Sequence, residues 1–208
     1  MSETKEKILD TAQRLIGEQG YSATSVRHIV SEAGVNLAAI HYHFGSKEEL
    51  LDAVIARKAG PVNEERLARL RRFEKESGGR GPTVHQALEA FLVPMAERAD
   101  RDPAFVRLMG RMMAEGLLVA IVQRHFHEIV ERFVGVLRRA VPELPEQEFR
   151  WRMHFMFGAM AYTMMFGSHN DVTGVGMDTA DFRGRIDRLV TFLTAGFQAP
   201  ATQSGAKQ

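Results

Sequence analysis

The stretch that decides the fold is TSVRHIVSEAGVNLAAIHYHF, residues 24–44. Its first half predicts a helix that Thr24 caps and that runs through Ala33, because three apolar residues recur at helical spacing: Val26, Ile29 and Val30. Gly34 can adopt left-handed backbone geometry without a Cβ penalty, so a tight turn is predicted directly after this helix.

The second half of the stretch predicts a short helix, from Leu37 to Phe44, with one buried and one exposed face. Asn36 is a good N-cap, and Ile40 and Phe44 are four residues apart, so both face inward. Small residues near the start of the exposed face permit close approach to base edges, and the hydroxyl and imidazoles behind them can reach phosphates. This is the arrangement of a helix-turn-helix that reads the major groove of DNA.

Helices are expected on both sides of this pair. Residues 4–19 have apolar side chains along one helical face. Ser46 and Glu49 have the spacing of a capping box and begin another helix. We expect a kink or a short break in that helix at Gly60-Pro61, because proline cannot donate the helical hydrogen bond. Residues 1–50 are therefore predicted to form an N-terminal three-helix helix-turn-helix domain.

The remaining residues, 51–208, also have helical periodicity and no sustained strand alternation, so the predicted fold class is all-α. A loop rich in Gly and Pro at residues 77–82 interrupts them. Further helices are expected at 83–99, from Pro103 onward, at 117–141, at 146–168 and at 178–197. The tail, residues 199–208, is small and polar and is expected to be disordered.

Composition excludes several classes of protein. The chain has 208 residues, of which 45% are hydrophobic and 25% charged, with a net charge of +1, so it is neither a disordered nor a polybasic protein. It has no cysteine, which excludes disulfides, thiol nucleophiles and Cys-ligated metals. No signal peptide or transmembrane run is visible, and a cytoplasmic location is expected. No catalytic motif appears, so we expect neither an enzyme nor a metal or cofactor site.

Residues 4–50 resemble the DNA-binding domain of TetR-family transcriptional regulators. After the opening helix, the resemblance is carried in order by Gly20-Tyr21-Ser22-Ala23-Thr24-Ser25-Val26, Ile29, Ala33-Gly34-Val35, Tyr42-His43-Phe44 and Lys47-Glu48-Glu49-Leu50. It implies that residues 51–208 form a larger helical domain for ligand binding and dimerisation. Three positions depart from the family pattern, which often has glycine, threonine or serine, and tyrosine where this chain has Ala38, Ala39 and His41.

A narrower resemblance links the chain to the PsrA-like, fatty-acid-responsive branch of that family. It rests on Asn36-Leu37-Ala38-Ala39 and on Tyr42-His43-Phe44-Gly45-Ser46-Lys47. The implied function is a repressor that binds a palindromic operator as a homodimer and is released by a small, mostly apolar effector. An activator with the same DNA contacts and an all-α ligand-binding protein without DNA binding are the alternatives.

The DNA contacts are expected on the exposed face of the two central helices. The residues predicted to lie nearest the bases are Arg27, Asn36, Leu37, Ala38, Ala39 and His41, and those predicted to hold the DNA backbone are Thr24, Ser25, Tyr42, His43 and Lys47. Residues 1–50 nevertheless carry five Lys or Arg against seven Asp or Glu, a net charge of −2. Binding must therefore depend on where the charges lie, and not on the charge of the domain.

The effector pocket and the dimer interface are expected in the larger domain. Methionine lines adaptable apolar cavities, and the predicted ligand-binding residues are Phe91, Met109, Met113, Phe126, Met156 and Met160. Two apolar stripes are the candidates for the dimer interface: Trp151, Phe155, Gly158, Tyr162 and Met165 in one, and Phe182, Ile186, Leu189, Leu193 and Phe197 in the other. The alternative is that one of these stripes packs only within its own subunit.

Overall fold

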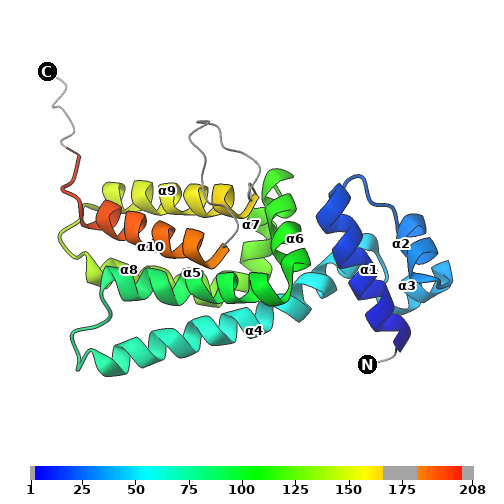
Figure 1. The fold of residues 1–208 in the computed structure, drawn as a ribbon, viewed down its shortest axis with the longest axis horizontal. Helices are drawn as coiled ribbons and strands as arrows, with labels where there is room; N and C mark the ends of the chain where they lie inside the picture. Colours follow the sequence, from blue (N-terminus) through cyan, green and yellow to red (C-terminus); the bar gives the residue numbers. More distant parts are fainter. Residues whose placement is uncertain (1–2, 166–181, 203–208) are drawn as a thin grey trace, which may run out of the picture. The chain divides into compact units, whose positions relative to one another are not determined.

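A computed structural model describes residues 3–165 and 182–202, and within these residues every regular element is helical. The expectation of an all-α fold is confirmed (Figure 1). The elements are α1 (Glu3–Gln19), α2 (Val26–Ala33), α3 (Leu37–His43), α4 (Lys47–Glu76), α5 (Val84–Arg101), α6 (Pro103–Ala114), α7 (Leu118–Ile121), the π-helix η1 (Val122–Phe126), α8 (His127–Ala140), α9 (Glu146–Met165) and α10 (Phe182–Gln198). Residues 166–181, which include the ends of the helices expected at 146–168 and 178–197, and residues 203–208 of the expected tail lie outside the described residues.

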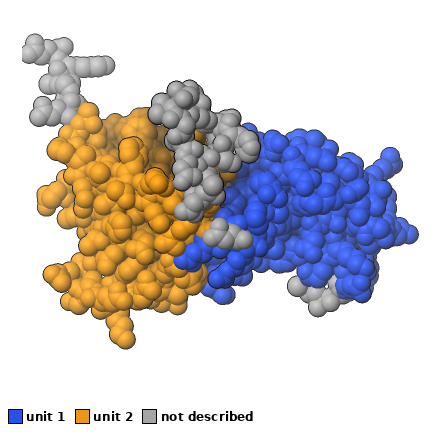
Figure 2. Space-filling view, in the orientation of Figure 1, with its two compact units in different colours: residues 1–64, 97–127 blue, residues 65–96, 128–208 orange. Residues whose placement is uncertain are grey.

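The chain divides into two compact units, coloured separately in Figure 2. The first unit holds residues 1–64 and 97–127, and the second holds residues 65–96 and 128–208. The boundary thus crosses α4 between Glu64 and Glu65. Helices α6, α7 and η1 belong to the same compact unit as the three N-terminal helices.

The core of the first unit forms around α1, which packs against α2, α3 and, most extensively, α6. Ile8, Ile16 and Ile40 are fully buried in this core. Gly17 explains the close contact with α6: a Cβ at this position would lie 3.3 Å from the carbonyl oxygen of Ala104. A side chain there would push the two helices apart, so the sequence places glycine where α1 meets α6.

The second unit has an aromatic core with one buried charge. Phe91 of α5 stacks on Phe133 of α8 at 4.3 Å between ring centroids. The buried Arg66 of α4 donates its Nε–H to the Phe91 carbonyl at 2.8 Å, and its guanidinium lies 4.3 Å from the Phe91 ring. Burial lowers the pKa of Arg66 to about 10. Helices α9 and α10 lie side by side, and Arg152 holds the end of α10 through the carbonyls of Gly196 and Phe197.

Three local expectations are corrected. Ser25, and not Thr24, caps α2, since its Oγ accepts the His28 N–H at 3.1 Å. Helix α4 runs from Lys47 to Glu76 with Pro61 inside it, so the chain has no break at Gly60-Pro61. The long segment at 117–141 is divided by the π-helical turn η1, where the Asn63 side chain donates to the His125 carbonyl at 2.8 Å.

Residues 3–165 and 182–202 contain no helix with the length and hydrophobicity that a membrane span requires.

Candidate nucleic-acid interface

The turn between α2 and α3 is fixed by Gly34. Its φ of 65° and ψ of 35° place it in the left-handed region, which costs an L-residue with a Cβ about 1–2 kcal/mol. The Gly34 N–H donates to the Ser31 carbonyl at 3.3 Å, and the Val35 N–H donates to the Val30 carbonyl at 3.0 Å. These two bonds form a Schellman motif, which ends α2 and turns the chain toward α3.

Helix α3 is anchored at both ends and on one side. Asn36 accepts the Ala38 N–H at 2.9 Å through its side-chain oxygen, as expected for an N-cap. Ile40 is fully buried, and Phe44 is 8% exposed. The opposite face is open: Tyr42 is 85% exposed and Leu37 is 39% exposed. A short, rigid helix is therefore presented to solvent along one face.

Most of the predicted DNA-contact residues lie on accessible surface. Those that are exposed are Ser25, Arg27, Asn36, Leu37, Ala38, His41 and Tyr42, and those that are partly exposed are Ala39, His43 and Lys47. Thr24 is the exception. Its side chain is fully buried, and its hydroxyl donates to the Gly20 carbonyl at 2.7 Å. A buried hydroxyl with its proton already donated cannot reach a phosphate, so Thr24 supports the loop and does not belong to the surface.

Two of the surface side chains are held in place by the backbone of the same unit. Lys47 donates its ammonium to the Tyr21 carbonyl, and its Nζ lies 4.1 Å from the Tyr21 ring centroid. Burial lowers the pKa of Lys47, while the negative charge of Glu115 opposes that shift. His41 places Nδ1 3.0 Å from the Gly45 carbonyl oxygen. These contacts restrict both side chains near the α3–α4 junction.

The negative charge of residues 1–50 is largely paired. Arg14 binds Glu32 at 2.8 Å and thereby joins α1 to α2. Arg57 of α4 binds Glu6 at 2.7 Å and Asp10 at 2.9 Å, both on α1. These acidic groups therefore join α1 to α2 and to α4.

Glu115, at the C-terminal end of α6, is a residue that sequence reasoning missed. Its carboxylate accepts the Tyr21 N–H at 2.8 Å, the Ser22 N–H at 3.0 Å and the Ser22 hydroxyl at 2.9 Å. Burial raises the pKa of Glu115, but the hydrogen bonds from Ser22 and Tyr21 outweigh it and hold the pKa below the usual value. The loop before α2 is thus attached to α6. No sequence signal could reveal this contact, because it joins residues 93 and 94 positions apart.

The predicted effector residues are distributed over both units. Met109, Met113 and Phe126 belong to the first unit, and Phe91, Met156 and Met160 belong to the second. Met113 and Met160 are half-buried, and the other four are buried. Of the pockets found on the described surface, neither the one beside Tyr21 nor the one at the end of α10 is lined by any of the six.

The two predicted dimer stripes differ in exposure. On α9, Trp151, Phe155, Gly158 and Tyr162 are all exposed, and the Met165 side chain lies outside the described residues. On α10, four of the five residues are buried within the subunit, namely Ile186, Leu189, Leu193 and Phe197, and Phe182 is half-buried. The four buried residues are core residues with no surface left for a partner. The open face of α10 carries Phe192, which is 71% exposed.

The comparisons with known proteins agree with this geometry. A family model described as bacterial regulatory proteins, tetR family, matches residues 8–54, and one described as tetracyclin repressor-like, C-terminal domain, matches residues 88–196. The chain is 32% identical over 130 residues to the HTH-type transcriptional regulator BetI of Rhizobium meliloti (strain 1021). It is 37% identical over 150 residues to the HTH-type transcriptional regulator SrpR of Pseudomonas putida. The alignments cover 56% and 69% of this chain and 64% of each relative.

A solved structure extends the similarity of fold to nearly the whole chain. The transcriptional regulator FadR from Bacillus subtilis, solved in complex with stearoyl-CoA, aligns with a TM-score of 0.60 at 20% identity, over 92% of this chain and 98% of that one. The family consists of transcription regulators and not of enzymes. The two matched models and the helix-turn-helix geometry lead to one conclusion: the chain belongs to the TetR family and carries the DNA-binding helix-turn-helix of that family.

Proposed function

We propose that the protein is a repressor that binds a palindromic operator as a homodimer and that a small, mostly apolar molecule releases it. The observation that carries the proposal is the exposed face of α3, capped by Asn36 and anchored by the buried Ile40. As part of the same proposal, the protein acts on DNA in the cytoplasm.

The proposed DNA surface consists of the accessible part of the helix-turn-helix. Arg27 and the α3 face at Asn36, Leu37, Ala38, Ala39 and His41 contact base edges, and Ser25, Tyr42, His43 and Lys47 contact phosphates. The small residues at 38 and 39 let the helix approach the floor of the groove. Ser25 can cap α2 and contact a phosphate at the same time. Its oxygen accepts the His28 N–H, and its hydroxyl proton stays available for the phosphate.

The proposed dimer interface is the exposed apolar face of α9 and α10. Trp151 and Phe155 stack on each other at 5.8 Å between centroids, and Trp151 is 51% exposed. Gly158 has no atom within 4 Å of the position of a Cβ, so a partner helix can approach there. Phe192 adds to this surface from α10. A single α3 reads too few base pairs for useful specificity, so two-fold pairing is required.

The apolar effector is supported by the resemblance to fatty-acid-responsive regulators. The relative of known structure that binds stearoyl-CoA shares the fold. To move the DNA-competent state from dominant to minor, such an effector must bind the other state about 10⁴-fold more tightly. Acyl chains and their thioesters are therefore the class to test first.

The test is fluorescence anisotropy with labelled DNA from upstream of the protein's own gene. Arg27→Ala is expected to weaken binding about tenfold. Arg71→Ala, which removes an exposed arginine of the second unit, is the charge-matched control and is expected to leave the affinity unchanged. Equal affinities in both variants and the unaltered protein would contradict the proposed surface.

The regulatory role needs two further measurements. Deleting the gene is expected to raise expression from a reporter under its own upstream region, whereas a fall in expression would make the protein an activator. Long-chain acyl compounds are expected to release the labelled DNA in a titration. Release by small polar metabolites alone would contradict the apolar effector.

A further inference from the structure

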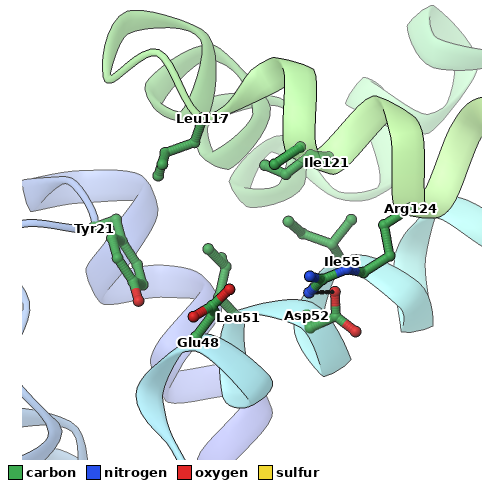
Figure 3. A pocket seen from close by; sticks show the side chains of 9 residues that line it. Tyr21, Glu48, Leu51, Asp52, Ile55, Leu117, Ile121 and Arg124 are labelled. Carbon is green, nitrogen blue, oxygen red and sulfur yellow. Dashed lines mark hydrogen bonds and ion pairs between the residues drawn. The ribbon is translucent and has the colours of Figure 1, made fainter.

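A pocket of about 270 Å³ lies within the first unit, beside the helix-turn-helix (Figure 3). Its apolar wall consists of Leu51 and Ile55 from α4 and of Leu117 and Ile121 from the segment around α7. The volume is just below the roughly 300–1,000 Å³ of pockets that take drug-sized ligands. A small apolar group therefore fits this pocket, and a long acyl chain does not.

The rim of the pocket carries three charged side chains, of which two neutralise each other. Arg124 lies 2.8 Å from Asp52 Oδ1, and His125 Nε2 lies 2.7 Å from the same oxygen. Burial raises the pKa of Asp52, but Arg124 and His125 outweigh it and hold the pKa below its usual value. The Asp52 carboxylate is therefore ionised and already engaged by Arg124 and His125, so a charged ligand at this point of the rim would compete with an existing ion pair.

Glu48 is the third charge on the rim. Figure 3 shows its carboxylate between the Tyr21 ring and the paired Asp52 and Arg124. Among residues 3–165 and 182–202, no hydrogen bond or ion pair engages this carboxylate. Burial raises the pKa of Tyr21, and the negative charge of Glu48 raises it further. The Glu48 carboxylate therefore lies near enough to the Tyr21 hydroxyl for the two groups to interact. With Asp52 and Arg124 cancelling, the rim has a net charge near −1.

We propose that this pocket binds a small amphiphilic cation, with its apolar body between Leu51, Ile55 and Ile121 and its ammonium group at Glu48. A carboxylate ligand would face Glu48 and would compete with Asp52 for Arg124. A neutral ligand would bury its apolar body equally well but leave Glu48 without a counter-ion.

The location of the pocket gives the ligand a route to the DNA surface, and this part of the inference rests on the proposed function. Tyr21 lines the pocket and also accepts the hydrogen bond from Lys47 through its carbonyl. Glu48, the residue that directly follows Lys47, also lines the pocket. A ligand held between α4 and α7 therefore contacts Tyr21, whose carbonyl holds Lys47, and Glu48, which follows Lys47 in α4, and its binding changes operator affinity.

Calorimetry with three probes of one skeleton tests the site directly: 4-phenylbutylamine, 4-phenylbutanol and 4-phenylbutanoate, each titrated into the full chain without DNA. The amine is expected to bind about threefold more tightly than the alcohol and about tenfold more tightly than the carboxylate, as an exposed ion pair allows. No binding by the amine, or tighter binding by the carboxylate, would overturn the proposal.

Two variants and a control locate the binding. Glu48→Gln is expected to abolish the preference for the amine while the alcohol still binds. Ala120→Phe, which fills the pocket from its lining, is expected to abolish binding of the amine and the alcohol. Glu49→Gln removes the neighbouring exposed carboxylate, which does not line the pocket, and is expected to change nothing. A preference that survives in Glu48→Gln would refute the role of this residue.

The coupling to DNA is tested separately. The amine is expected to change the anisotropy-measured operator affinity of the unaltered protein at least threefold, and to have no effect on Ala120→Phe. Amine binding without any change in operator affinity would refute the coupling and leave the site standing. A ligand-free protein that binds no operator would refute the proposed function and leave the calorimetric result valid.

Discussion

Replacing Glu115 with glutamine is expected to weaken the attachment of the α1–α2 connection to α6. The Glu115 carboxylate accepts three hydrogen bonds, from the Tyr21 N–H, the Ser22 N–H and the Ser22 hydroxyl. Glutamine keeps one acceptor oxygen but turns an amide NH₂ toward the remaining donors. At least one of the three hydrogen bonds to the carboxylate is therefore lost. Ser22 is exposed, so water can reach the donor that loses its partner.

The expected cost is about 1.5 kcal/mol, the low end for a hydrogen bond to a charged group, because water can replace part of the interaction. For a chain of this size, each kcal/mol lowers the melting temperature by about 2–4 °C, so a fall of about 4 °C is expected at neutral pH. Amide hydrogen exchange of Tyr21 and Ser22 reports the same loss locally, as faster exchange at both positions.

The pH dependence has a defined sign. The folded-state pKa of Glu115 lies below its ordinary value. Its stabilisation is therefore complete above the ordinary carboxyl pKa of about 4.3 and is lost as the pH falls through the lowered folded value. The difference in melting temperature between the unaltered protein and Glu115→Gln is expected to shrink on acidification below about pH 4.

A matched control separates this contact from a general effect of charge. Glu64→Gln removes an exposed carboxylate of the same unit and is expected to leave the melting temperature within about 1 °C. The reasoning is refuted if Glu115→Gln and Glu64→Gln melt together and the Tyr21 and Ser22 amides exchange at unaltered rates.

Three further predictions concern the turn, the DNA surface and the dimer. Gly34→Ala is expected to lower the free energy of unfolding by about 1–2 kcal/mol, because the φ of 65° strains a residue with a Cβ. Gly135→Ala inside α8 is expected to raise the free energy of unfolding by about 0.5–1 kcal/mol. Chemical denaturation measures both changes. Lys47→Ala is expected to weaken binding to every DNA sequence and to reduce the salt slope by about one unit, and an unchanged slope would remove Lys47 from the phosphate contacts. Phe192→Glu is expected to give a monomer at micromolar concentration in light scattering, and a dimer in that variant would place the interface elsewhere.

Local chemistry explains why so much of the first unit could be predicted from the sequence. Gly34 can end a helix in left-handed geometry whatever surrounds it, and Asn36 caps α3 with an atom only two residues away. Such contacts lie within one turn of the chain, so the order of the residues specifies them. Local chemistry does not decide which of two neighbouring hydroxyls caps a helix. Ser25 caps α2 because Thr24 is buried and its hydroxyl donates to the Gly20 carbonyl.

Contacts between residues far apart in the chain could not be predicted from the sequence. Glu115 and the pair formed by Asp52 and Arg124 resemble ordinary solvated charges when the chain is read along its length. Only folding brings Glu115 to Ser22 and Arg124 to Asp52, across 93 and 72 positions of sequence. No local pattern encodes such a pairing, because each partner is chosen by the packing of the helices that carry it.

The apolar stripes of α9 and α10 show the same division most clearly. Helical periodicity identified both stripes, because side chains three and four positions apart share a face. Periodicity does not say what covers a face. The stripe with Leu189 and Leu193 is buried within its own subunit, whereas Trp151 and Phe155 stay exposed on α9 and Phe192 stays exposed on α10. The sequence determined that these helices are apolar; the tertiary structure decided which apolar face stays in contact with water, because burial depends on the neighbours that a helix acquires only after the chain has folded.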